Sequence, residues 1–277
     1  MHEIDLRRAA FGDQRSPDVL PVAGSPRRRL LGAIVLGARG RYAAAAALLA
    51  GLVRDRDPVV ASLALSTRAS HCRQLGGHGV ARGLDGAALR PASSAGPGAD
   101  PDGLDAGGAL ADALLGLAAD HLGTGRLTAS RRVLERAGEA AARNWRTRVR
   151  LGWVTAELAL ASGDAPAATA PAEAALEKAT AAGSVRHVVK SRLVLAAALG
   201  AAGHKRRAGD LVSGALATAE EYDLSSLSWP AGLIAADLRP ADADRHRSRT
   251  AAVLHAVLLS SDPEGRRLAR ESPWVPV

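Results

Sequence analysis

The chain has 277 residues, 47% of them hydrophobic and 23% charged, with a formal net charge of +8. A single cysteine, Cys72, excludes an internal disulfide and a thiolate-rich metal site, and it fits a reducing compartment. Aromatic residues make up only 3%. A core must therefore be packed from Ala, Leu and Val, which favours closely approaching helices over sheets.

The first part of the chain, 1–24, mixes charges with prolines and lacks a sustained hydrophobic period, so we expect a flexible N-terminal arm there. Amphipathic patterns then predict helices at 26–38, 41–54, 58–75, 78–90, 104–122, 126–142, 145–162, 165–182, 185–202, 205–221, 225–238 and 241–260. Segment 91–103 is rich in Pro, Ala, Gly, Ser and Asp and predicts a flexible insertion that loops out or divides the array. Segment 263–277 is predicted to be a C-terminal tail.

Start and stop signals separate several of these helices. Asp57 is a capping residue and Pro58 follows it at a first helical position. Gly163 tolerates the positive φ at a helix end, and Asp164 can cap the next helix. Ser184 after a glycine is a similar pair, and Asn144 is a good N-cap.

Small residues recur at fixed distances around five glycines, which are Gly40, Gly76, Gly125, Gly163 and Gly203. The positions at −7, +5 and +12 from each glycine hold Ala33, Ala45, Leu52, Ala69, Ala81, Ala88, Ala118, Ser130, Ala137, Ala156, Ala168, Ala175, Ala196, Ala208 and Ala215. Because the residues at a contact set the interhelical distance, these columns predict closely packed helix pairs. Successive glycines are 36, 49, 38 and 40 residues apart. One helix pair per repeat at this period indicates an α-solenoid.

Gly40-Arg41-Tyr42, followed by Ala45, a leucine-rich helix and Asp57-Pro58, resembles the second half of a tetratricopeptide (TPR) unit. The resemblance covers about 25–222, but the Trp near the start of the first helix and the closing Pro are mostly missing. It implies an all-α, right-handed solenoid of about five to six antiparallel helix pairs. The first two repeats would occupy 25–90, three repeats 104–222, and terminal capping helices 223–262.

The TPR-like register implies that positions −13, −10, −6 and −3 on each first helix face a concave groove. The candidate groove residues for peptide binding are Arg27, Arg73, Arg150, Trp153, Glu157 and Lys190. Basic side chains on an apolar channel suit a protein or peptide partner that carries acidic groups, with Trp153 as its anchor. The alternative interpretation is that the arginines are only solvated and Trp153 is part of the core.

Two basic stretches suggest a second function. In the first, basic residues surround the aromatic side chain of a tryptophan, at Arg143, Asn144, Trp145, Arg146, Arg148 and Arg150. The second lies one repeat later, at Arg186, His187 and Lys190. These residues could attract the phosphates of a nucleic acid or another anion. The alternative is the polar start of a helix, because alternating positions on a helix cannot all point one way. Basic charge at a helix start opposes the helix dipole, which indicates a bound anion or an acidic neighbour.

No phosphate-binding loop, nucleophile elbow, zinc-protease motif or cysteine pair occurs in the sequence. The closest cluster, His71, Cys72 and His78, lacks a further metal ligand. The sequence therefore predicts a non-enzymatic interaction module without cofactor or metal, such as a regulatory adaptor in bacterial transcription or signalling.

We expect a cytoplasmic protein. The arginines at 27–29 and the apolar segment after them imitate a signal peptide, but no cleavage site follows. The longest uncharged apolar run, 43–53, is too short to cross a bilayer. The sequence leaves the oligomeric state open.

Overall fold

The computed structural model describes residues 2–15, 24–141 and 144–277. The described residues form helices and loops, with no strand among them. In chain order the helices are α1 (Glu3–Phe11), α2 (Pro26–Ala38), α3 (Tyr42–Ala50), α4 (Pro58–Gln74), α5 (His78–Ser94), α6 (Ala106–Gly123), α7 (Leu127–Ala141), α8 (Trp145–Ala161), α9 (Ala165–Ala181), α10 (Val185–Ala201), α11 (Lys205–Glu221), α12 (Ser225–Leu238), the 3₁₀ turn η1 (Pro240–Asp242), α13 (Ala243–Leu259) and α14 (Pro263–Glu271).

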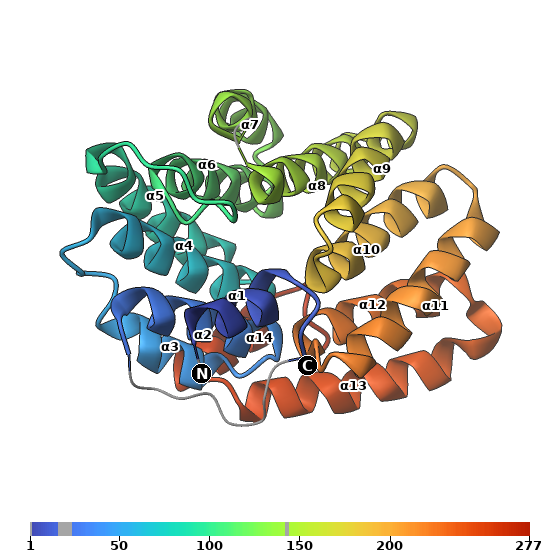
Figure 1. Ribbon diagram of the computed structural model, residues 1–277. Helices are drawn as coiled ribbons and strands as arrows, with labels where there is room; N and C mark the ends of the chain where they lie inside the picture. Colours follow the sequence, from blue (N-terminus) through green and yellow to red (C-terminus); the bar gives the residue numbers. More distant parts are fainter. Residues whose placement is uncertain (1, 16–23, 142–143) are drawn as a thin grey trace.

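Helices α2 to α13 form consecutive pairs that stack along the chain (Figure 1). The predicted all-α solenoid is thus confirmed. All five glycines of the repeat have positive φ, between 72° and 88°, so each turns the chain where an L side chain would be strained. Asp57, Asp164 and Asn144 accept hydrogen bonds from backbone N–H groups at their helix starts, as predicted. Ser184 does not cap its helix, because its Oγ contacts His187 Nδ1 at 2.8 Å.

The columns of small residues lie between the paired helices. Every side chain at the −7, +5 and +12 positions is at most 1% exposed. The one hydroxyl among them, Ser130 Oγ, donates to the carbonyl of Ala118 across the α6–α7 pair at 2.8 Å. This hydrogen bond replaces the one that the hydroxyl would otherwise form with water. Small side chains hold the axes close, as the sequence predicts.

The last helices return to the first ones, and the solenoid closes into a ring (Figure 1). Ala43 N–H at the start of α3 donates to the carbonyl of Ser260 after α13 at 2.9 Å. The side chain of Gln74 on α4 donates to the carbonyl of Ser226 on α12 at 2.6 Å. Arg39 after α2 forms an ion pair with Asp223 before α12. The stack therefore surrounds a central space.

Three segments differ from the sequence-based prediction. Within the predicted arm 1–24, residues 3–11 form α1, whose Leu6 and Phe11 are buried, because their apolar side chains pack on α2. Pro17 and Pro21 lie outside the described residues.

The insertion 91–103 does not divide the array, and only its second part is a loop. Helix α5 continues through Pro91 to Ser94 and packs directly on α6. Asp100 then accepts hydrogen bonds from Arg7 and from Arg27, both at 2.7 Å, which hold the loop against α1 and α2.

The tail 263–277 begins with a helix. Asp262 caps α14, and Leu268 is buried with Leu75 and Trp229 in one apolar cluster. This cluster seals the junction where the ring closes. No helix of the described ranges is long and apolar enough to cross a membrane.

Candidate functional site

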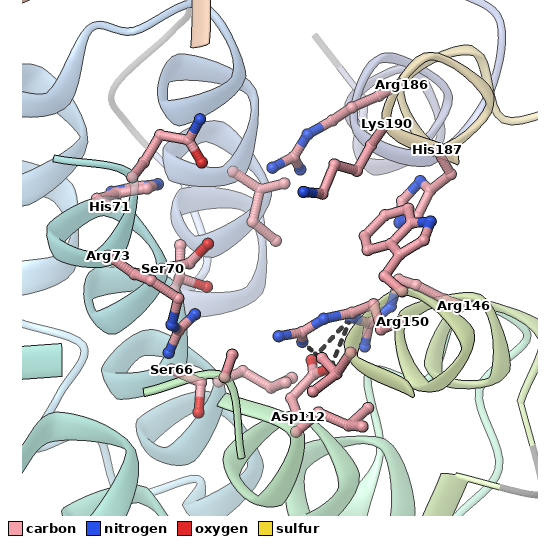
Figure 2. A pocket seen from close by; sticks show the side chains of 18 of the residues that line it. Ser66, Ser70, His71, Arg73, Asp112, Arg146, Arg150, Arg186, His187 and Lys190 are labelled. Carbon is pink, nitrogen blue, oxygen red and sulfur yellow. Dashed lines mark hydrogen bonds and ion pairs between the residues drawn. The ribbon is translucent and has the colours of Figure 1, made fainter. Parts of the chain in front are cut away.

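The ring encloses a cavity of about 200 Å³ that is lined by the first helix of each pair, α2, α4, α6, α8, α10 and α12, together with α1 (Figure 2). The second helices form the outer layer and contribute no lining residue within the described parts. Most of the predicted inward positions reach the cavity, namely Ile34, Leu63, Ser66, Ser70, Arg73, Asp112, Leu115, Ala119, Arg150, Trp153, Glu157 and Lys190. The remaining side chains at inward positions of the register, Leu30, Leu122, Leu160, Leu193, Ala197 and Arg27, do not line the cavity.

One wall carries a buried carboxylate shared by two arginines. Asp112 on α6 accepts two hydrogen bonds from Arg146 Nη1, at 3.0 and 2.7 Å, and forms an ion pair with Arg150. Burial alone would raise the pKa of Asp112, but the two guanidinium charges outweigh burial and lower it. Asp112 is the acidic neighbour that the basic helix start of α8 predicted. One negative charge here faces two positive ones.

The opposite wall holds Arg73 on α4 between two acids. Its Nε donates to Asp120 at 2.7 Å, and its Nη2 contacts Asp85. Burial raises the pKa of Asp85, Arg73 lowers it, and the charge of Asp120 raises it again, with a net rise. Arg73 is therefore fully engaged within the protein.

Trp153 forms a third side of the cavity and is half-buried. Its indole stacks on His187 at 5.5 Å between ring centroids, and its Nε1 donates to Ser191 Oγ at 2.8 Å. Lys190 pairs with Glu157 at 2.9 Å and lies 6.0 Å from the indole centroid. Trp153 thus packs against the core on one face and borders the cavity with its other atoms. It is therefore partly a core residue and partly a groove residue.

Arg186 on α10 differs from the other cations of the cavity. No carboxylate of the described chain forms an ion pair or hydrogen bond with it, although it is half-buried and borders the open space. Burial lowers the pKa of Arg186 to about 10, partly opposed by Tyr42 and helped by the nearby charges of Arg150 and Arg146. Arg186 remains charged at neutral pH. Figure 2 shows its charged end, beside that of Lys190, extending into the cavity.

The two histidines of the cavity are neutral at physiological pH. Burial lowers the pKa of His71 to about 3, and the charge of Arg186 adds to this effect. Burial also lowers the pKa of His187 well below its ordinary value, again with help from Arg186. Neither ring can therefore supply a cation to the site.

Arg27 does not reach the cavity, contrary to prediction. It pairs with Asp100 at 2.7 Å and also donates to the carbonyl of Leu104. Its register position is correct for a first helix, but at this end of the stack α1 and the loop after α5 cover the groove. The other five predicted residues, Arg73, Arg150, Trp153, Glu157 and Lys190, line the same cavity.

Arg146 and Arg186 line the cavity although neither was among the predicted groove residues. Both stand 17 residues before their repeat glycines, Gly163 and Gly203. This position lies four residues before the inward position −13, so it shares the same helix face. Extending the register by one turn would have found both arginines. Phe11 also lines the cavity, and no repeat signal marks it.

The charged groups of the site are suited to binding an anion. Among the described residues five cations line the cavity, Arg73, Arg146, Arg150, Arg186 and Lys190, whereas two carboxylates do. No group of three or more His, Cys, Asp or Glu side chains in the described ranges could hold a metal ion.

Comparisons with known proteins identify the class of fold. No protein-family model matches the chain, and no curated protein matches it. Among solved structures it is similar to the crystal structure of a Rap protein complexed with Competence and Sporulation Factor, with a TM-score of 0.59 and 11% sequence identity. The match covers 89% of this chain and 66% of that chain, so this chain spans just under two thirds of the Rap chain. The chain is thus a helical repeat protein, and the resemblance drawn from its sequence is confirmed at the level of fold.

Proposed function

We propose that the protein is a non-enzymatic binding module that holds a short peptide, or an end of a protein partner, in its central cavity. The proposal rests on the way in which the inner helices converge on one cavity. Inward positions from all six stacked pairs meet in one cavity that combines an apolar lining with a surplus of cations. Pockets with an apolar lining and a few convergent polar groups are the usual sites of ligand binding.

The size of the cavity limits what can enter it. The cavity has a volume of about 200 Å³. A folded partner cannot enter, whereas a chain end or a side chain can. The Rap protein of similar fold, which was crystallised in a complex with Competence and Sporulation Factor, supports ligand binding by this architecture. A regulatory adaptor would use such a site to respond to its partner.

We do not propose a catalytic step. A general base needs a pKa near the working pH and an open position toward the substrate. His71 and His187 have strongly lowered pKa values, and Asp112 and Glu157 are each held in ion pairs. The pKa of Asp85 is raised to about 7, but Asp85 is buried against Arg73 and does not line the cavity. These groups favour binding over proton transfer.

The nucleic-acid alternative receives no support from the basic stretch of α8. Arg146 and Arg150 turn inward to Asp112, while Arg148 is exposed on another face. Arg143 lies outside the described residues. A phosphate backbone needs several cations on one accessible surface, which this arrangement does not provide.

Filling the cavity tests the proposal. Ala119 lines the cavity, so Ala119→Leu occupies space without removing a polar contact. The full chain is immobilised and exposed to a pool of random pentapeptides, and retained peptides are identified by mass spectrometry. We expect enrichment of a subset by the wild type and its loss in Ala119→Leu.

The matched control is Ala167→Leu, which adds the same side chain at an exposed position of α9. It should retain the same peptides as the wild type. If the wild type enriches no peptide, or if Ala119→Leu retains the same set, binding in the cavity is refuted.

A further inference from the structure

We propose that Arg186 anchors a carboxylate of the bound peptide, either its C-terminal carboxylate or an Asp or Glu side chain. The inference rests on the proposed function, and it adds the chemical group that the ligand must carry.

Each of the other cations of the cavity already has an acidic partner. Arg73 contacts Asp85 and Asp120, Lys190 contacts Glu157, and Arg146 and Arg150 share Asp112. Arg186 has none in the described chain, although it is half-buried and borders the cavity. A charge that is half-buried without a partner loses part of its hydration and gains no ion pair in return. A site that keeps such a charge is therefore suited to a partner that comes from outside.

The neighbouring charges also favour an anion. Arg150 and Arg146 lie close enough to lower the pKa of Arg186, and Asp112 compensates only one of those two charges. An anion placed between Arg150 and Arg186 would relieve this repulsion. In Figure 2 the charged ends of Arg150 and Arg186 point into the same space from two sides.

The rest of the lining favours a peptide carboxylate over inorganic phosphate. A guanidinium group donates two parallel N–H bonds to a planar carboxylate. Apolar side chains from Ile34, Leu63 and Leu227 border the same cavity. They would pack against the apolar part of a peptide, whereas inorganic phosphate would leave them in contact with water.

Three pools of N-acetylated pentapeptides test the inference. The first has a free C-terminal carboxylate and no Asp or Glu, the second a C-terminal amide and one Asp or Glu, and the third a C-terminal amide and no acid. We expect the wild type to enrich peptides from the first or the second pool but not from the third. The pool that is enriched identifies the source of the carboxylate.

The affinity of an enriched peptide is then measured for Arg186→Gln. We expect the dissociation constant to rise at least about tenfold, because charge-assisted hydrogen bonds to the carboxylate are lost. The control is Arg192→Gln, on the same helix but outside the cavity lining, where Arg192 contacts Thr218 at 3.5 Å. It should leave the affinity unchanged. A cooperative thermal melt of Arg186→Gln without peptide shows that the variant folds.

Three results would overturn the carboxylate anchor. They are equal enrichment from the third pool, an unchanged affinity in Arg186→Gln, and displacement of the peptide by inorganic phosphate but not by acetate. The proposed function would still hold in each of these cases, provided that Ala119→Leu no longer binds the peptide. If no pool is enriched at all, the proposed function itself fails.

Discussion

Asp112→Asn is expected to destabilise the ring strongly, because it removes a negative charge that balances two arginines between α6 and α8. Asp112 and Arg146 have side chains only 6% and 7% exposed, so the ion pair is shielded from water. Asparagine keeps the shape of the side chain and one oxygen acceptor. It leaves the guanidinium groups of Arg146 and Arg150 close together without the carboxylate that they share.

The magnitude follows from the bonds that are lost. Hydrogen bonds to charged groups contribute roughly 1.5–3 kcal/mol each, and Arg146 makes two of them to Asp112. Removing one partner from a buried ion pair costs about 3–5 kcal/mol, because the remaining charge is uncompensated. Since domains are stable by about 5–15 kcal/mol, this loss is a large part of the total.

Urea denaturation followed by circular dichroism measures the effect. We expect the free energy of unfolding to fall by about 3–5 kcal/mol with an unchanged slope against urea. The matched control is Asp244→Asn, which breaks the pair of Asp244 with Arg247 on the exposed face of α13 and should leave the midpoint unchanged. If both variants unfold at the wild-type midpoint, the buried ion pair does not stabilise the packing of α6 against α8.

The remaining predictions concern the helix contacts, the loop after α5 and the groove. Ala156→Leu places a larger side chain in a fully buried contact of α8 and should lower the free energy of unfolding by about 1–3 kcal/mol, whereas Ala167→Leu should leave it within about 0.5 kcal/mol; equal urea midpoints would contradict the close packing. The pKa of Asp100 is lowered to about 2, because Arg7 and two backbone N–H groups outweigh its burial. Its contribution to stability is therefore fully present above about pH 4 and is lost as pH falls through about 2. Asp100→Asn should thus unfold at lower urea than the wild type at pH 6, and the gap should shrink steadily as pH falls toward 2; a gap that is the same at pH 6 and pH 2 would refute the ionic role of Asp100. Arg27→Ala should bind an enriched peptide as tightly as the wild type, as measured by calorimetry. Weaker binding by this variant would show that Arg27 contributes to the binding site.

The helix pairs were predictable from the sequence because their signals are local. A capping Asp57 with Pro58, or a glycine such as Gly163 at positive φ, acts within one turn of the chain. The columns of small residues are also short-range signals, since residues such as Ala156 and Ala168 belong to consecutive helices. For the same reason many of the positions that the register turns inward line the cavity.

Contacts between distant parts of the chain could not be read in this way. Closure depends on α13 and α14 meeting α3 and α4, through bonds such as that between Ala43 and Ser260. Helices α1 and α14 have nine residues each and lie outside the repeat register, so no column of small residues marks them. Arg27 was assigned to the groove from its register position. Its pairing with Asp100 could not be predicted, because Asp100 belongs to a loop that was expected to be flexible.

The charge balance of the cavity also lay beyond the sequence. Arg186 and Lys190 are both cations on the same helix, and only the structure shows that Glu157 reaches Lys190. The register positions of Arg146 and Arg186 were available, but which of the two would find a carboxylate depended on the packing of α6 against α8.

Hydrogen–deuterium exchange of the full chain, with and without an enriched pentapeptide, tests the central claim most directly. Peptide binding inside the ring should slow exchange in the inner helices α4, α8 and α10 and leave the outer helices α7, α9 and α11 unchanged. Protection confined to the outer helices, with no change in the inner ones, would contradict a binding site at the centre of the ring.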